Sequence, residues 1–142
     1  SAASDVYKRQ MYHQGPVLYP FGYGLSYSDF AYEKIESFKQ DKKNIRVTVS
    51  VKNTSGRDGE EVVQLYASYP ESKVERPSKQ LRAFRRIPIK AGETRKVTLT
   101  VPKEELGYWN EGKQMFVVEP GTVKLLIGAS SEDIRLEGKI RL

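Results

Sequence analysis

Apolar and polar residues alternate with a period of two in several short stretches of the chain. The clearest stretch is residues 45–51, in which every second residue is isoleucine or valine and the others are polar. A strand points successive side chains to opposite faces, so this period predicts a strand with one buried and one solvated face. Further stretches of strand-forming residues are 61–67, 81–87, 97–101, 122–127 and 134–142.

Turn-forming residues separate these stretches, at 53–59, 91–93 and 120–121. Short strands at a spacing of about 8–12 residues, with turns between them, predict an all-β fold: an antiparallel, immunoglobulin-like sandwich of about seven to eight strands. Helical periodicity is nearly absent, and the best helical candidate is a single turn at residues 102–106. The alternation places four residues in the expected core: Val49, Leu65, Leu99 and Leu125.

Composition limits the classes of protein that fit. The 142 residues, 38% of them hydrophobic, suit one domain with one core. No apolar run approaches the roughly 20 residues of a membrane span, so we expect no membrane partner. No signal peptide is visible at the start, which says little if the chain is a fragment. With no cysteine and a single histidine, the chain offers no disulfide framework and no set of ligands for a transition metal.

The net charge of +6 is concentrated in residues 73–96, which we call the basic stripe. It holds nine basic residues and only two acidic ones. A solvated face is the favoured interpretation, docking on an acidic surface of a neighbouring domain is the second, and attraction of an anionic polymer is the third. No signature of a nucleic-acid-binding fold accompanies the stripe, so we expect no nucleic-acid partner. The basic residues are Lys73, Arg76, Lys79, Arg82, Arg85, Arg86, Lys90, Arg95 and Lys96.

One motif has a specific resemblance. Residues 18–27, Leu-Tyr-Pro-Phe-Gly-Tyr-Gly-Leu-Ser-Tyr, resemble the signature that family 3 glycoside hydrolases carry between their catalytic region and their fibronectin type III-like domain. Residues 60–66 resemble that family's E-V-V-Q-L-Y strand, 76–84 its R-P-x-K-x-L-x-x-F pattern, and 119–121 its E-P-G turn. The resemblance implies three segments: 1–10, a disordered junction outside the family pattern; 11–29, an inter-domain linker loop; and 30–142, the fibronectin type III-like domain.

The resemblance also implies a function. Family 3 enzymes hydrolyse terminal β-linked glucose or xylose with two carboxylates, as β-glucosidases or β-xylosidases, and both carboxylates lie upstream of the signature. The chain is therefore expected to be a non-catalytic accessory domain, without cofactor or metal, whose partners are the catalytic domains of a periplasmic or secreted parent enzyme. Among its own adjacent carboxylates, Glu60 and Glu61 are expected on opposite faces of a strand, where they cannot share a substrate. The pairs Glu104 with Glu105 and Glu132 with Asp133 are expected to be solvated charges in turns.

The signature also supplies the candidate site. Its apolar residues have two interpretations, a plug between domains or a platform on which sugars stack, and the plug is favoured because aromatic rings tend to be buried. We expect the end nearest Phe30 to pack on the sandwich and the end nearest Pro16 to need another domain. An independent polysaccharide- or polymer-binding module is the alternative function. The predicted inter-domain contact residues are Tyr19, Phe21, Tyr23, Leu25 and Tyr27.

Residues 53–55, Asn-Thr-Ser, form an N-glycosylation sequon. The same residues suit a plain turn, which is the favoured interpretation.

Overall fold

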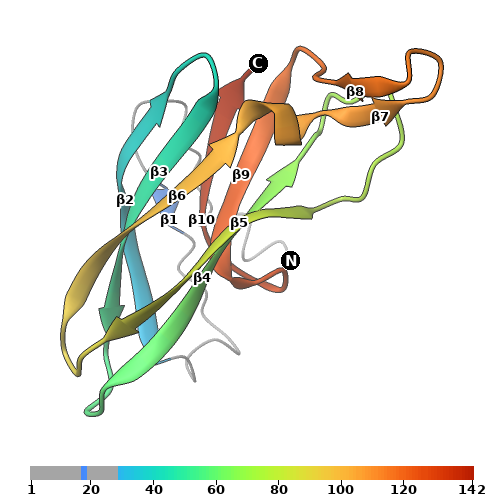
Figure 1. Ribbon diagram of the computed structural model, residues 1–142. Coiled ribbons are helices and arrows are strands. Elements are labelled where there is room, and N and C mark those ends of the chain that lie inside the picture. Colours follow the sequence, from blue (N-terminus) through green and yellow to red (C-terminus); the bar gives the residue numbers. More distant parts are fainter. Residues whose placement is uncertain (1–16, 19–28) are drawn as a thin grey trace.

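The computed structural model describes residues 17–18 and 29–142, and these form two β-sheets packed face to face (Figure 1). The smaller sheet has the strand order β2-β3-β6, with β2 at Phe30–Gln40, β3 at Asn44–Asn53 and β6 at Thr94–Pro102. The larger sheet has the order β1-β10-β9-β4-β5, with β1 at Val17–Leu18, β10 at Asp133–Arg141, β9 at Thr122–Ser130, β4 at Gly59–Ser68 and β5 at Gln80–Ile89. Every pairing is antiparallel, so the predicted sandwich is confirmed.

The core forms where the alternating strands of the two sheets face each other. In β3 the predicted period holds, because Val47 and Val49 are fully buried and lie opposite Leu99 and Val97 of β6. From the larger sheet, β4 contributes Leu65 and β9 contributes Leu125. The four predicted core residues are confirmed, with exposures of 0% for Val49, 0% for Leu65, 1% for Leu99 and 1% for Leu125.

The larger sheet also buries apolar side chains on its outer face. Leu126 of β9 and Ile134 of β10 are each 8% exposed and form a second cluster, against which Tyr66 packs. Ile134 reaches this face because the pairing of β9 with β10 shifts register beside it, as a β-bulge does. At this bulge the backbones of β9 and β10 lie so close that Gly128 has no room for a side chain, because a Cβ there would lie 1.9 Å from the backbone oxygen of Asp133.

Asn53 organises the turn that follows β3. Its side chain is fully buried and donates hydrogen bonds to the backbone oxygens of Arg57 (2.8 Å) and Ile89 (2.9 Å). Its Oδ1 accepts from the backbone N–H of Ser55 at 2.9 Å and from the Ser55 hydroxyl at 2.7 Å. The turn interpretation of this sequon is therefore confirmed, because the amide nitrogen that a glycan would use is already bonded inside the fold.

Two short elements connect β6 to β9. The 3₁₀ helix η1 (Lys103–Leu106) is the single turn predicted at residues 102–106. The hairpin of β7 (Tyr108–Asn110) and β8 (Met115–Val117) was not predicted, and Figure 1 shows it projecting beyond the end of the sandwich. Within the described part of the chain, no helix is long and apolar enough to cross a membrane.

Candidate interaction site

The β7–β8 hairpin is built from two short aromatic segments around a tight loop. Asn110 closes the loop by accepting a hydrogen bond from the backbone N–H of Lys113 at 2.9 Å, and Gln114 takes a left-handed conformation with φ of 51°. At the base, Gly107 leaves no room for a side chain, since a Cβ would lie 2.8 Å from the backbone oxygen of Val117. The hairpin is therefore held in a defined position on η1.

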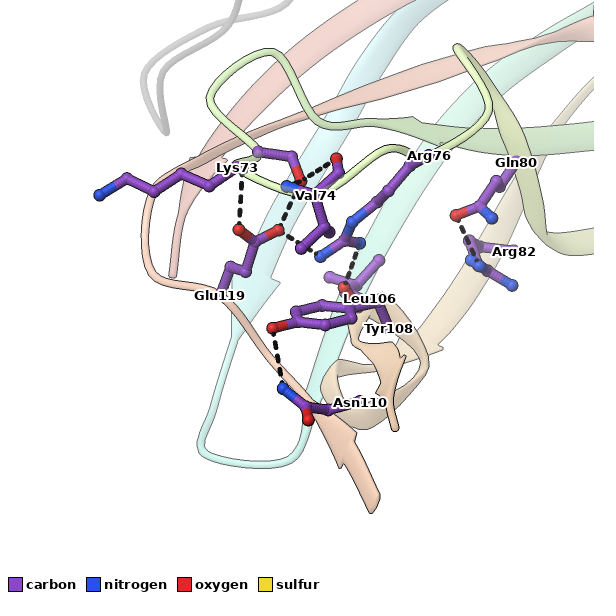
Figure 2. A network of polar contacts seen from close by, with 10 residues as sticks. Lys73, Val74, Arg76, Gln80, Arg82, Leu106, Tyr108, Asn110 and Glu119 are labelled. Carbon is purple, nitrogen blue, oxygen red and sulfur yellow. Dashed lines mark hydrogen bonds and ion pairs between the residues drawn. The ribbon is translucent and has the colours of Figure 1, made fainter. Parts of the chain in front are cut away.

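Arg76 ties the hairpin to the sandwich (Figure 2). Its side chain is only 5% exposed and lies over the ring of Tyr69, 3.9 Å from the centroid, and 5.3 Å from that of Tyr108. Its guanidinium donates to the backbone oxygen of Leu106 at 2.9 Å and to Glu119 Oε1 at 2.7 Å. One cation thus joins the connection before β5, the end of η1 and the connection after β8.

Glu119 receives three kinds of donor at this junction. The Ser72 hydroxyl donates at 2.6 Å and the backbone N–H of Lys73 at 3.0 Å, in addition to Arg76. These donors, the Ser72 hydroxyl first, hold the pKa of the Glu119 carboxyl below its ordinary value. The carboxylate stays charged at neutral pH and fixes the connection between β4 and β5.

Two clefts lie beside the hairpin. One, of about 510 Å³, is lined by Trp109, Gln80 and Arg82 among others. The other, of about 560 Å³, is lined by Leu81, Glu105 and Phe116 among others. The rings of Trp109 and Phe116 meet edge to face, with centroids 5.2 Å apart, and both are exposed, at 44% and 63%. The clefts and the exposed rings form a surface suited to contact with another molecule.

A second polar cluster lies at the start of β2. The Tyr32 hydroxyl donates to Glu61 Oε2 at 3.1 Å, and Arg135 pairs with Asp133 and donates to the backbone oxygen of Phe30 at 3.2 Å. Burial raises the pKa of the Glu61 carboxyl, and burial with the neighbouring Glu61 raises the pKa of the Tyr32 hydroxyl. The cluster anchors the backbone of Phe30, the first residue of β2.

The predicted contact residues Tyr19, Phe21, Tyr23, Leu25 and Tyr27 lie outside the described residues, as do residues 1–10. Immediately before them, Val17–Leu18 forms strand β1, in register with Leu136 and Glu137 of β10, and not a loop. The edge of β10 thus provides backbone partners for Val17 and Leu18, and the expectations for residues 19–27 stay predictions.

The adjacent carboxylates do not behave alike. Glu60 pairs with Arg86 at 2.9 Å while Glu61 bonds Tyr32, and Glu104 and Glu105 are exposed on η1. Asp133 is not a solvated turn charge. It is partly buried against Arg135, because β10 begins at this residue and turns its side chain toward the polar cluster.

The basic stripe also contains both exposed and buried charges. Arg85, Arg86 and Lys90 are exposed, in agreement with a solvated face. The interpretation is wrong for Arg76, whose charge is buried against Glu119. No local pattern in the sequence indicates this pair, whose partners are 43 residues apart. Within the described residues, no group of three or more His, Cys, Asp or Glu side chains is placed to hold a metal ion.

The fold and this surface define a class: a β-sandwich domain of the immunoglobulin kind with an added hairpin. Residues 61–131, half of the chain, match the fibronectin type III-like domain family, and the chain belongs to this family. The matched family is that of a non-catalytic domain.

Known relatives carry this domain within longer chains. The thermostable β-glucosidase B of Acetivibrio thermocellus is 41% identical over 88% of this chain, and the probable β-glucosidase D of Emericella nidulans is 37% identical over 84%. The chain spans only 17% of the length of each.

The chain also matches a small part of longer proteins whose structures have been solved. The crystal structure of a β-glucosidase from Kluyveromyces marxianus in complex with glucose matches 89% of this chain, with a TM-score of 0.77 and 38% identity. A GH3 β-glucosidase from Bifidobacterium adolescentis matches 87%, with a TM-score of 0.76 and 36% identity. The chain covers 15% and 18% of these structures, so it corresponds to one accessory domain of such enzymes.

Proposed function

We propose that this domain belongs to a β-glucosidase of glycoside hydrolase family 3 and braces the catalytic part of that enzyme. The observation that carries the proposal is the 41% identity over 88% of this chain to a β-glucosidase of which the chain spans only 17%. The reaction of the parent is then hydrolysis of terminal β-linked glucose, with the two carboxylates of a retaining glycosidase supplied by the rest of the polypeptide. The relatives named above are β-glucosidases, which favours glucosides over xylosides.

Residues 11–29 connect the domain to the catalytic part in this proposal. Contacts with the sandwich on both sides of the signature support this role of the segment. Before it, Val17–Leu18 pairs with β10, and after it, Arg135 of β10 donates to the backbone oxygen of Phe30. The segment between these anchors concentrates four aromatic residues and Leu25. We propose that Tyr19, Phe21, Tyr23, Leu25 and Tyr27 bury against the catalytic part as well as the sandwich, since burial of one such ring is worth about 1.5–3 kcal/mol.

The test compares the full-length gene product with a version that lacks residues 29–142. The full-length protein should hydrolyse p-nitrophenyl β-glucoside faster than the β-xyloside. The shortened protein should melt at a lower temperature and lose activity as it unfolds. A shortened protein that is as stable and as active as the full-length one would contradict the bracing role.

A second candidate is direct binding of polysaccharide, which the exposed Trp109 and Phe116 beside a cleft favour. Their rings are inclined by 73°, so they do not form the flat platform on which two consecutive sugars of a chain stack. A pull-down of the isolated chain with insoluble β-glucan tests this function. Retention that is lost in Trp109→Ala would support it over the bracing role.

A further inference from the structure

The exposed large hydrophobic side chains of the described residues are not scattered. All six lie on two segments, β5 and residues 109–118 of the hairpin region: Leu81, Phe84, Trp109, Met115, Phe116 and Val118. Single exposed apolar residues are normal on a soluble protein, but a group of them marks an interaction site. We call this group the apolar patch.

Shared clefts and contacts show that the patch is continuous. Trp109 contacts Phe116 edge to face, and Phe116 lines the same cleft as Leu81. Leu81 in turn lines a groove with Phe84, along the edge strand β5. The patch therefore extends from β5 to the hairpin. Figure 1 shows the position of these elements, with the hairpin projecting beyond the sandwich.

Two arginines accompany the β5 part of the patch, Arg82 and Arg85, and the groove that they line with Leu81 and Phe84 has no acidic residue among the described residues that line it. Arg82 also lines the two clefts beside the hairpin, one with Glu104 and Glu105 and the other with Glu75 and Glu111. Among the described residues it forms no ion pair with these carboxylates and donates to the amide oxygen of Gln80 at 2.7 Å. Arg85 lines the groove next to Phe84, and among the described residues it has no ion pair. Aromatic residues, methionine and arginine are the residues enriched in the centres of protein interfaces.

The hairpin is also held ready for contact. The buried Arg76–Glu119 pair and the close approach of Gly107 to Val117 fix its base, so docking would not have to order a flexible loop. A surface that is ordered before binding loses less conformational entropy when it binds.

We propose that the apolar patch docks on the catalytic part of the same polypeptide, on an apolar surface bordered by carboxylates that meet Arg82 and Arg85. This proposal rests on the proposed function and adds to it a second contact region, on the edge of the large sheet opposite to β1. Relatives of which the chain spans 17% have ample surface for such a contact. Among the described residues neither Arg82 nor Arg85 has an ion pair, which favours a partner surface with carboxylates, and a second copy of this chain would be repelled by its net charge of +6.

Met115 provides the test, because it is 52% exposed in the isolated domain and is the one methionine besides Met11. Hydrogen peroxide converts exposed methionine to the sulfoxide, and mass spectrometry of the tryptic peptide 114–124 measures the rate. We expect Met115 to be oxidised at least about tenfold more slowly in the full-length protein than in the isolated chain. Equal rates in the two proteins would overturn the proposal.

Variants separate docking from a general change in stability. Arg85→Glu and Trp109→Ala should restore rapid oxidation of Met115 in the full-length protein while leaving the melting temperature of the isolated chain unchanged. Lys42→Glu, an exposed change of the same charge in the turn between β2 and β3, should leave Met115 protected. Protection that survives Arg85→Glu and Trp109→Ala would contradict docking through this patch.

Other occupants give different results. Oxidation that slows as the isolated chain is concentrated would identify a second copy, and oxidation that slows with soluble β-glucan would identify a sugar site; both overturn the proposal. The β-glucosidase activity of the same full-length sample distinguishes the two claims. An active enzyme with unprotected Met115 overturns the docking alone, whereas an inactive protein with protected Met115 overturns the proposed activity alone.

Discussion

Replacing Asn53 by alanine should destabilise the isolated domain more than any exposed substitution in the same turn. The Asn53 side chain is fully buried and takes part in four hydrogen bonds, as donor to Arg57 and Ile89 and as acceptor from the N–H and hydroxyl of Ser55. A typical hydrogen bond contributes about 1 kcal/mol net, and a buried group left without a partner costs about 1–3 kcal/mol.

The expected loss follows from which partners water can reach. Ser55 and Arg57 lie at the surface side of the turn, so water replaces part of their bonds, while the bond to Ile89 is buried. The expected loss is therefore about 2–4 kcal/mol of the free energy of unfolding. Asn53→Asp should cost at least as much at pH 7, because a carboxylate oxygen would face the two backbone oxygens to which Nδ2 now donates.

Urea denaturation measures both variants, with the slope of the transition as a check that the unfolded states are comparable. Asn44→Ala is the matched control, since the Asn44 side chain is partly exposed and should cost less than about 0.5 kcal/mol. A loss for Asn53→Ala that equals the loss for Asn44→Ala would refute the role given to this turn.

Three further predictions concern the core and two carboxylates. Leu99→Ala should cost about 2–5 kcal/mol, and an unchanged melting temperature would show that the core is assigned wrongly. Glu119→Gln should be less stable than the native chain by about 1–2 kcal/mol at pH 7. Since its donors lower the pKa of Glu119, this stabilisation is present above about pH 4.3 and is lost as the pH falls through the lowered pKa, so the two melting curves should converge in acid. For Glu61 the sign is opposite: burial raises its pKa, so stability rises as the pH falls from the raised pKa toward about 4.3, and Glu61→Gln should flatten that part of the profile.

The strands and the core were predictable because their signal is local and periodic. Residues 45–51 alternate strictly, and this alternation alone placed Val49 inside. The outer cluster of Leu126 and Ile134 was not predicted, because a bulge in β10 shifts Ile134 to the other face and a sequence does not mark where a bulge occurs.

The candidate surface was less predictable than the fold. The strands of the hairpin have three residues each, too short for a periodic pattern, although the aromatic segments on either side of residues 111–114 could have indicated it. Arg76 and Asp133 were expected in solvent because their residue types usually are. Their partners Glu119 and Arg135 bury them, and for Arg76 that partner is brought close only by the completed fold.

Hydrolysis of p-nitrophenyl β-glucoside, measured side by side for the isolated chain and for the full-length gene product, tests the central claim most directly. The account predicts turnover by the full-length protein and none above buffer by the isolated chain, because the chain is an accessory domain and the two catalytic carboxylates lie elsewhere in the polypeptide. Turnover by the purified isolated chain that is abolished by replacing a single aspartate or glutamate would contradict it.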